Sequence, residues 1–198
     1  MKKILSILGL ILTFTVCNIS FAKQPYVHGG LKYFDYGLES GDLQTINTSL
    51  VALGFSSSTS STDNSGVGFE FGVGYDLNDN FAIEGSYVDL GTLEINTTTT
   101  GPAESIKTEI DGHSFAFAGV VKFGEPASHF YGRAGMHSWD LSAKVTTSLG
   151  SSSDALGDGT DPWFGVGYRH EWFRIGYDYY KMDDSDITSI TGSIVYNF

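Results

Sequence analysis

The sequence predicts an all-β protein, an eight-stranded antiparallel up-and-down transmembrane β-barrel. Eight segments alternate apolar residues with polar residues or glycine, as expected for strands with one apolar face. Short turns and long polar segments alternate between these strands, which is typical of a barrel with its tight turns at one rim. A soluble lipocalin-like barrel, in which the same alternation points inward, is the alternative.

The clearest alternation lies in residues 65–90. Every second residue from Val67 to Leu77 is apolar, and the positions between them are glycine, Glu70 or Asp76. The water-facing side of a soluble strand would carry Thr, Lys or Ser, because glycine weakens a strand. Glycine suits a narrow, crowded interior, so the apolar face is expected to point towards lipid. Residues 78–80 form the turn to the next strand.

The N-terminus is expected to be a signal peptide over residues 1–22, which leaves a barrel domain over residues 23–198. Lys2 and Lys3 precede an apolar run over residues 4–16, and a small-residue cleavage site ends at Ala22. The chain's one cysteine, Cys17, lies in the predicted leader. The mature protein is therefore expected to lack disulfides, thiol chemistry and cysteine metal sites.

The mature chain is strongly acidic. Without Lys2 and Lys3, the 11 basic residues fall to 9 against 23 acidic residues, a net charge of −14. Such a charge excludes nucleic acid as an electrostatic partner. No later apolar run approaches the ~20 residues of a spanning helix, so a closed barrel is the remaining way to cross a membrane.

The expected strands cover residues 26–36, 65–77, 81–90, 107–123, 129–141, 163–169, 172–180 and 187–198. Their length of ~9–11 residues or slightly more matches a tilted transmembrane strand. Three polar segments, 37–64, 91–106 and 142–161, are expected to be long extracellular loops. Residues 78–80, 124–128 and 170–171 are expected to be short periplasmic turns, and residues 181–186 a connection of medium length.

Aromatic residues on the apolar face cluster beside the short turns and the C-terminus. They are expected to form one girdle at the periplasmic membrane interface. A soluble barrel has no reason to place aromatic residues at one height on every strand. The girdle residues are Tyr75, Phe81, Phe123, Phe130, Tyr168, Phe173, Tyr196 and Phe198.

The runs 69–75, 81–91, 131–135 and 194–198 resemble the OmpA/OmpX-type eight-stranded outer-membrane β-barrel superfamily. The resemblance implies export to the cell outer membrane and contact with outer-membrane lipid and lipopolysaccharide. It also implies that Tyr196 and Phe198 are the C-terminal signal read by the outer-membrane assembly machinery. Structural proteins, adhesins, small channels and lipid-modifying enzymes share this fold, so the resemblance leaves the activity open.

Several charged residues take the inward parity of their strands and are expected to form a lumen charge network. An isolated buried charge costs several kcal/mol, so these groups should pair across the lumen. We expect a static plug, and a gate or narrow ion path is the alternative. The network residues are Lys32, Glu70, Glu84, Lys122, Arg133, Arg169, Arg174 and Asp178, with Lys32, Glu70 and Asp178 at one height and Glu84, Arg133 and Arg174 in a lower layer.

Catalytic and metal-binding patterns are weak. The pairs His113-Ser114 and His137-Ser138 cannot form dyads by themselves, because adjacent strand residues point to opposite faces. The aspartates of the polar segments lack calcium-loop spacing, and the histidines lack ligand spacing. We therefore expect no catalytic residues, no metal and no cofactor.

The expected function is an envelope-structural or surface-interaction role for a monomeric barrel. Its acidic loops could solubilise the surface, or contact bridging divalent cations and host or phage surface ligands. A small channel or ligand-carrying barrel is the alternative, and a lipid A-modifying enzyme comes third. The loop carboxylates are Glu39, Asp42, Asp63, Glu94, Glu104, Asp154, Asp158, Asp161, Asp183, Asp184 and Asp186.

Overall fold

The computed structural model describes residues 24–38, 40–101, 103–182 and 185–198. The predicted signal peptide lies outside these ranges. The elements are β1 (Gln24–Asp35), α2 (Ser40–Ala52), β2 (Ser57–Thr62), β3 (Ser65–Asp76), β4 (Phe81–Thr100), β5 (Glu104–Glu125), β6 (Ser128–Thr147), β7 (Gly150–His170), β8 (Phe173–Met182) and β9 (Ser185–Asn197). No helix within the described ranges has the length and apolar character to cross a membrane.

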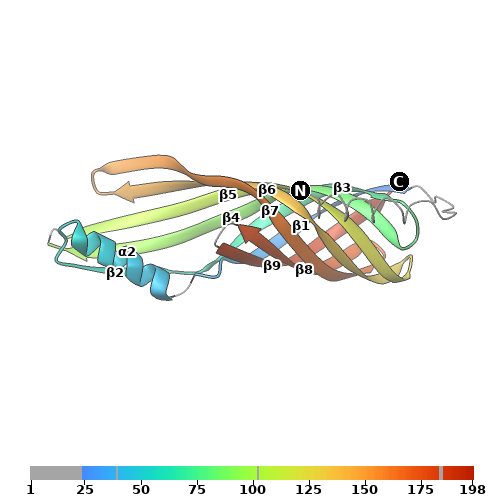
Figure 1. The fold of residues 1–198 in the computed structure, drawn as a ribbon, viewed down its shortest axis with the longest axis horizontal. Helices are drawn as coiled ribbons and strands as arrows, with labels where there is room; N and C mark the ends of the chain where they lie inside the picture. The colour runs from blue at the N-terminus through green and yellow to red at the C-terminus, as the bar shows by residue number, and fades with distance from the viewer. Residues whose placement is uncertain (1–23, 39, 102, 183–184) are drawn as a thin grey trace, which may run out of the picture.

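The strands close into a ring. Pairing follows the order β4-β3-β1-β9-β8-β7-β6-β5, and β5 pairs with β4 to complete the circle. Every pairing is antiparallel, and the N-terminal strand β1 pairs with the C-terminal strand β9. The short strand β2 pairs with the distal part of β4, outside the ring. The predicted eight-stranded up-and-down barrel is confirmed (Figure 1).

The apolar face of each strand points out of the barrel. Phe71, Phe117 and Ile194 are exposed on the outer wall, with 61% of Phe117 accessible. Lys32 and Asp178 are fully buried inside the ring. This arrangement of apolar residues outside and charged residues inside is that of a transmembrane barrel, and it excludes the lipocalin-like alternative.

The inward glycines make room for large inward side chains. A Cβ at Gly72 would collide with the His28 ring, and one at Gly74 would collide with the Tyr26 ring. A Cβ at Gly165 would collide with the carboxylate of Asp178. The glycine-rich inner face therefore reflects the narrow lumen of an eight-stranded barrel, whose interior is only wide enough for side chains.

The prediction of long loops is wrong for the segments 91–106 and 142–161, because most of their residues belong to strands. β4 and β5 pair through Thr99 and Glu104, and β6 and β7 pair through Thr147 and Gly150. These two hairpins extend well beyond the ends of β8, β9 and β1 (Figure 1). In the β6–β7 extension the polar sequence resembles a loop because water contacts both faces of segments such as 151–153, which removes the need for an alternating pattern. In the β4 extension the alternation continues, with Leu93, Ile95 and Thr97 buried. The backbone ladder continues because each strand still has a neighbour to pair with.

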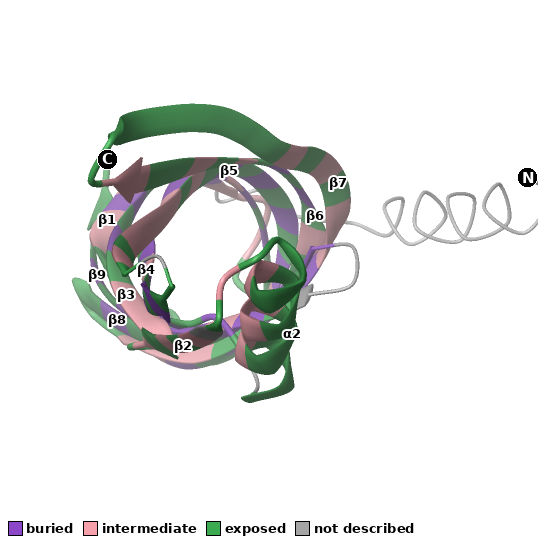
Figure 2. Cartoon of the chain, turned by 90° about the vertical axis from the view of Figure 1, so that its left-hand side faces the viewer, coloured by how far each residue is buried: buried purple, intermediate pink, exposed green. Residues whose placement is uncertain are grey.

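The prediction of a loop over residues 37–64 is also wrong, because this segment contains α2 and β2. Leu43, Ile46, Asn47 and Leu50 form the less exposed face of α2, with the i, i+3, i+4, i+7 spacing of an amphipathic helix. Leu43 and Ile46 pack against the apolar cluster in the barrel mouth. Viewed from this end, α2 lies beside the opening of the ring, against β2 (Figure 2).

Candidate functional site

The barrel lumen contains a layer of charged side chains centred on Lys32 of β1. Lys32 Nζ lies 2.6 Å from Asp178 Oδ2 on β8 and 3.1 Å from Glu70 Oε2 on β3. It also donates a 2.8 Å hydrogen bond to Thr191 Oγ1 on β9. The ammonium group is fully buried, and its three donors are used by these three partners.

A second layer is built around Glu84 of β4. Arg174 Nη1 lies 2.7 Å from Glu84 Oε1, and Tyr26 donates a 2.7 Å hydrogen bond to the same oxygen. Arg174 Nη2 lies 2.9 Å from His28 Nδ1. The aromatic ring of Tyr131 lies against the Arg174 guanidinium, with 5.3 Å between Cζ and the ring centroid. These contacts join four strands across the lumen.

Arg133 of β6 connects the two layers. Its Nη1 lies 3.2 Å from both Glu70 Oε1 and Glu84 Oε2, and its Nη2 lies 2.8 Å from Asp178 Oδ2. Three cations (Lys32, Arg133 and Arg174) thus face three carboxylates (Glu70, Glu84 and Asp178), so their charges cancel. We call these six residues the central network. Each cation contacts at least one carboxylate directly.

Lys122 and Arg169 do not join the central network. Lys122 Nζ lies 2.9 Å from Asp76 Oδ1 at the end of the barrel with the short turns. Arg169 donates hydrogen bonds to Asn197 Oδ1 at 3.1 Å and to the Glu171 carbonyl at 2.9 Å. Strand parity predicts the face of a residue, but its height in the lumen depends on the register between strands.

Sequence reasoning missed polar partners of the network and one Ser–His contact. Tyr26, His28 and Thr191 share the inward parity with the charges, and that parity was the available signal. Ser114 Oγ lies 3.0 Å from His137 Nδ1 on the neighbouring strand, although neither sequence-adjacent pair forms a dyad. Both residues are fully buried in the lumen, away from the lipid-facing surface.

The predicted girdle residues lie on the outer wall near the short turns. Register aligns Phe123, Phe130 and Tyr168 across β5, β6 and β7. The rings of Phe130 and Tyr168 are 5.0 Å apart, and those of Tyr196 and Phe198 are 5.2 Å apart. Tyr75 and Tyr168 are half-buried, whereas the other six residues are exposed.

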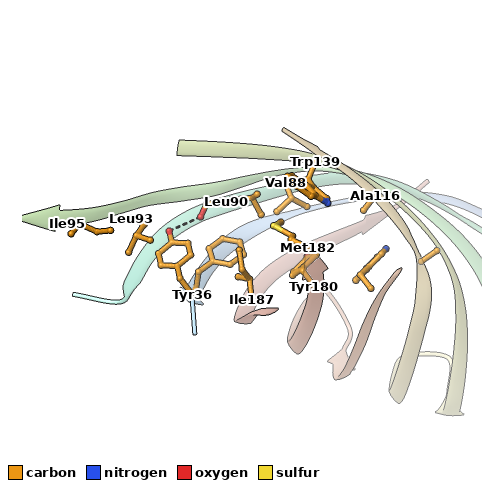
Figure 3. Close-up of a cluster of buried hydrophobic side chains, with 13 residues drawn as sticks. Tyr36, Val88, Leu90, Leu93, Ile95, Ala116, Trp139, Tyr180, Met182 and Ile187 are labelled. Carbon is orange, nitrogen blue, oxygen red and sulfur yellow. Dashed lines mark hydrogen bonds between the residues drawn. The ribbon is translucent and has the colours of Figure 1, made fainter. Parts of the chain in front are cut away.

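Between the central network and the end of the barrel that carries the extended hairpins, the lumen becomes apolar. The parallel rings of Trp163 and Tyr180 stack 5.5 Å apart, and Phe34 packs against Tyr180. Val88 and Leu90 continue the apolar lining towards the mouth (Figure 3). The lumen therefore has a charged middle and an apolar mouth, which the strand pattern alone did not reveal.

The extended hairpins carry exposed charges. Lys107 Nζ lies 2.8 Å from Glu94 Oε2 and 3.0 Å from Glu109 Oε1. The hydrogen bonds with Lys107 lower the pKa of both Glu94 and Glu109, and they raise the pKa of Lys107. Within the described residues, no group of three or more His, Cys, Asp or Glu side chains is placed to hold a metal ion.

The model of the outer membrane protein beta-barrel domain family matches residues 7–198. Among solved structures, Ail of Yersinia pestis is similar with a TM-score of 0.51 and 18% identity, covering 91% of this chain and all of that chain. A complex of Ail with the heparin analogue sucrose octasulfate is similar with a TM-score of 0.50 and 16% identity over 89% of this chain and 97% of that chain. OprG of Pseudomonas aeruginosa is similar with a TM-score of 0.56 and 10% identity over 89% of this chain and 97% of that chain. No curated protein matches the sequence.

Proposed function

Because this chain belongs to the outer membrane protein beta-barrel domain family, we propose that it is a non-conducting outer-membrane anchor which displays a stiff β-extension at the cell surface. The short turns and the C-terminus face the periplasm, and the extended hairpins with α2 face outward, because outer-membrane barrels have short periplasmic turns. The role is structural or surface-interacting, without catalysis. Outer-membrane lipid and lipopolysaccharide surround the barrel.

The central network is the observation that supports a plugged lumen. Six buried side chains from β1, β3, β4, β6 and β8 meet in one hydrogen-bonded cluster. An ion entering this layer would have to break pairs whose members are buried away from water, which leaves uncompensated charges. The stacked Trp163 and Tyr180 rings obstruct the lumen above it.

The extension is the part suited to surface interactions. β4 continues ten residues beyond Leu90, roughly 33 Å of strand at ~3.3 Å per residue. Its exposed carboxylates and the mature net charge of −14 would repel polyanions. The sulfated sugar seen with Ail therefore suggests little about ligands of this chain, whose host or phage surface partners are expected to be basic or bridged by divalent cations.

Two further roles belong to the same proposal. The exposed aromatic residues beside the short turns form the periplasmic girdle, where amphipathic rings favour the membrane interface. Tyr196 and Phe198, exposed at the end of β9, serve as the assembly signal. A lipid-modifying enzyme is disfavoured because the Ser114–His137 contact is enclosed in the lumen, where a lipid ester has no access.

We expect the purified protein to show no steady conductance in planar lipid bilayers, because the central network and the Trp163–Tyr180 stack occupy the lumen. Single-channel recording in concentrated KCl measures this directly. A sixteen-stranded porin inserted into the same bilayers is the positive control, since its lumen is an aqueous channel. A stable conductance in most insertions of the wild-type protein would show that the lumen is open.

We expect Thr98→Cys to react with a membrane-impermeant maleimide on intact cells, because Thr98 is exposed on the outer face of the extension. Asn80→Cys, in a short turn at the opposite end, should react only after the outer membrane is permeabilised. The parent protein is the background control, since its one cysteine lies in the predicted leader. Labelling of Asn80→Cys but not Thr98→Cys on intact cells would reverse the proposed orientation.

A further inference from the structure

The barrel mouth contains an apolar cavity of about 320 Å³. Each strand from β4 to β9 contributes to its wall, which includes Leu90, Leu93, Trp139, Met182 and Ile187. Figure 3 shows these side chains converging on the inner side of the strands. The interior of an outer-membrane barrel is ordinarily polar. An apolar wall at the end of the barrel that opens to water therefore needs an explanation other than hydration of the lumen.

The polar side chains described in the cavity wall are already hydrogen-bonded. Among the described residues of the wall, only Tyr36 and Trp139 bring a hydrogen-bonding side-chain group, and none is charged. The Tyr36 hydroxyl donates a 2.9 Å hydrogen bond to the Leu90 carbonyl, and Trp139 Nε1 donates a 2.8 Å hydrogen bond to Asp161 Oδ2. A molecule in the cavity would meet the apolar faces of these rings, and the described side chains of the wall offer no partner for a charge.

The cavity ends in a floor and does not continue through the barrel. Phe34, Trp163 and Tyr180 are fully buried and pack together beneath it. Under this floor, the Arg133 guanidinium lies against the Trp163 ring, with 4.6 Å between Cζ and the ring centroid. Passage onward would require an apolar molecule to displace the buried ion pairs of the central network, which is strongly unfavourable. The arrangement suits retention at the mouth.

Water is a poor occupant of this space. At ~30 Å³ per molecule, the cavity would take about ten waters, and its mainly apolar wall provides few of the two to four polar partners that each water needs. An enclosed apolar cavity of ~150 Å³ stays dry and binds benzene. The mouth opens to water, but its side-chain lining is of the same apolar kind. We infer that the mouth is a binding site for one small, neutral, apolar molecule of alkyl or aromatic type. The volume is too small for a helix or a folded partner.

The two methionines of the mature chain allow a direct test. Met182 lies in the cavity wall, whereas Met136 faces lipid with 49% of its surface exposed. The protein is labelled with ¹³C-methyl methionine, placed in phosphatidylcholine nanodiscs and titrated with toluene. We expect a saturable shift of the Met182 methyl signal and only a linear drift of Met136 as toluene enters the lipid. Non-saturating drift of both signals together would overturn the proposal.

Cavity-filling variants locate the binding. Leu93→Trp should weaken the saturable toluene binding by about tenfold or more, equivalent to ~1.4 kcal/mol. Ile110→Trp, at the position paired with Leu93 on the neighbouring strand β5, should do the same. It serves if Leu93→Trp does not fold, as judged by heat-modifiable migration on gels. Val166→Trp, on the lipid-facing wall, should leave binding unchanged. Unchanged affinity in a folded cavity variant would overturn the assignment.

A charged molecule of similar size tests whether the site prefers neutral ligands. Benzoate matches toluene in size but carries a charge, so it should produce no saturable Met182 shift at pH 7. Saturable benzoate binding as tight as that of toluene would contradict the assignment of the site to neutral molecules.

Discussion

Arg133→Met is expected to lower the free energy of unfolding of the barrel by about 3–5 kcal/mol, the cost of breaking a buried ion pair on one side. Arg133 contacts Glu70, Glu84 and Asp178, and its removal leaves three buried carboxylates facing only two cations. Methionine retains much of the aliphatic stem, so the loss reports mainly on charge. Urea unfolding of the protein in lipid vesicles, followed by tryptophan fluorescence, measures the change.

Two variants separate the charge effect from lost packing. Arg169→Met removes an arginine that sits at the short-turn end and contacts no carboxylate of the central network, so its effect should be below about 1 kcal/mol. Adding Asp178→Asn to Arg133→Met restores two cations against two carboxylates and should recover part of the loss, as measured by a double-mutant cycle. Equal stability of Arg133→Met and wild type would show that the network does not hold the barrel together.

Phe117→Arg is expected to destabilise the barrel by about 2–4 kcal/mol, because a lipid-facing arginine near the bilayer midplane has this cost in outer-membrane barrels. Phe117 projects from the outer wall between Gly85 and Met136 of the neighbouring strands. It lies six residues above Phe123, roughly 20 Å along the strand, which is about 14 Å of depth at a tilt of ~45°. Unfolding in vesicles and the yield of folded protein in cells are the measurements.

Thr98→Arg is the matched control for the lipid-facing arginine. Thr98 is exposed on the outer face of the same curved sheet, but it lies on the extension above the membrane. A surface substitution in water usually changes stability by less than ~0.5 kcal/mol. If both arginines were tolerated equally, Phe117 would be facing water, and the transmembrane assignment of the outer wall would be wrong.

The transmembrane strands could be predicted because each has lipid on one side and a crowded lumen on the other. That asymmetry places apolar residues such as Phe71 and Phe117 at every second position, with glycine or charge between them. The β6–β7 extension could not be predicted because water bathes both faces of segments such as 151–153. Nothing in the side-chain pattern of such a segment distinguishes a water-exposed strand from a loop. The β4 extension did carry a short signal, because the buried residues Leu93 and Ile95 alternate with polar residues. The helix α2 did carry a signal, the spacing of Leu43, Ile46 and Leu50.

The candidate site could be predicted only in part. Inward parity placed the six residues of the central network on the lumen side of their strands. It also included Lys122 and Arg169, which lie at a different height along the barrel axis, near the short turns. Parity could not predict that Arg133 contacts carboxylates of both layers, or that Ser114 meets His137 across strands. The apolar cavity was not foreseen, because its walls come from six different strands together with the segment after β1.

The sequence by itself determined the fold class, the face that each barrel residue takes and the acidic character of the surface, since these follow from local alternation and composition. The tertiary structure alone decided which charges meet, where the lumen changes from charged to apolar, and how far the hairpins extend. The physical reason is that side-chain period reports only the environments on the two sides of a strand. Height and partnership depend on the register between strands, which is set when the ring closes through β1 and β9.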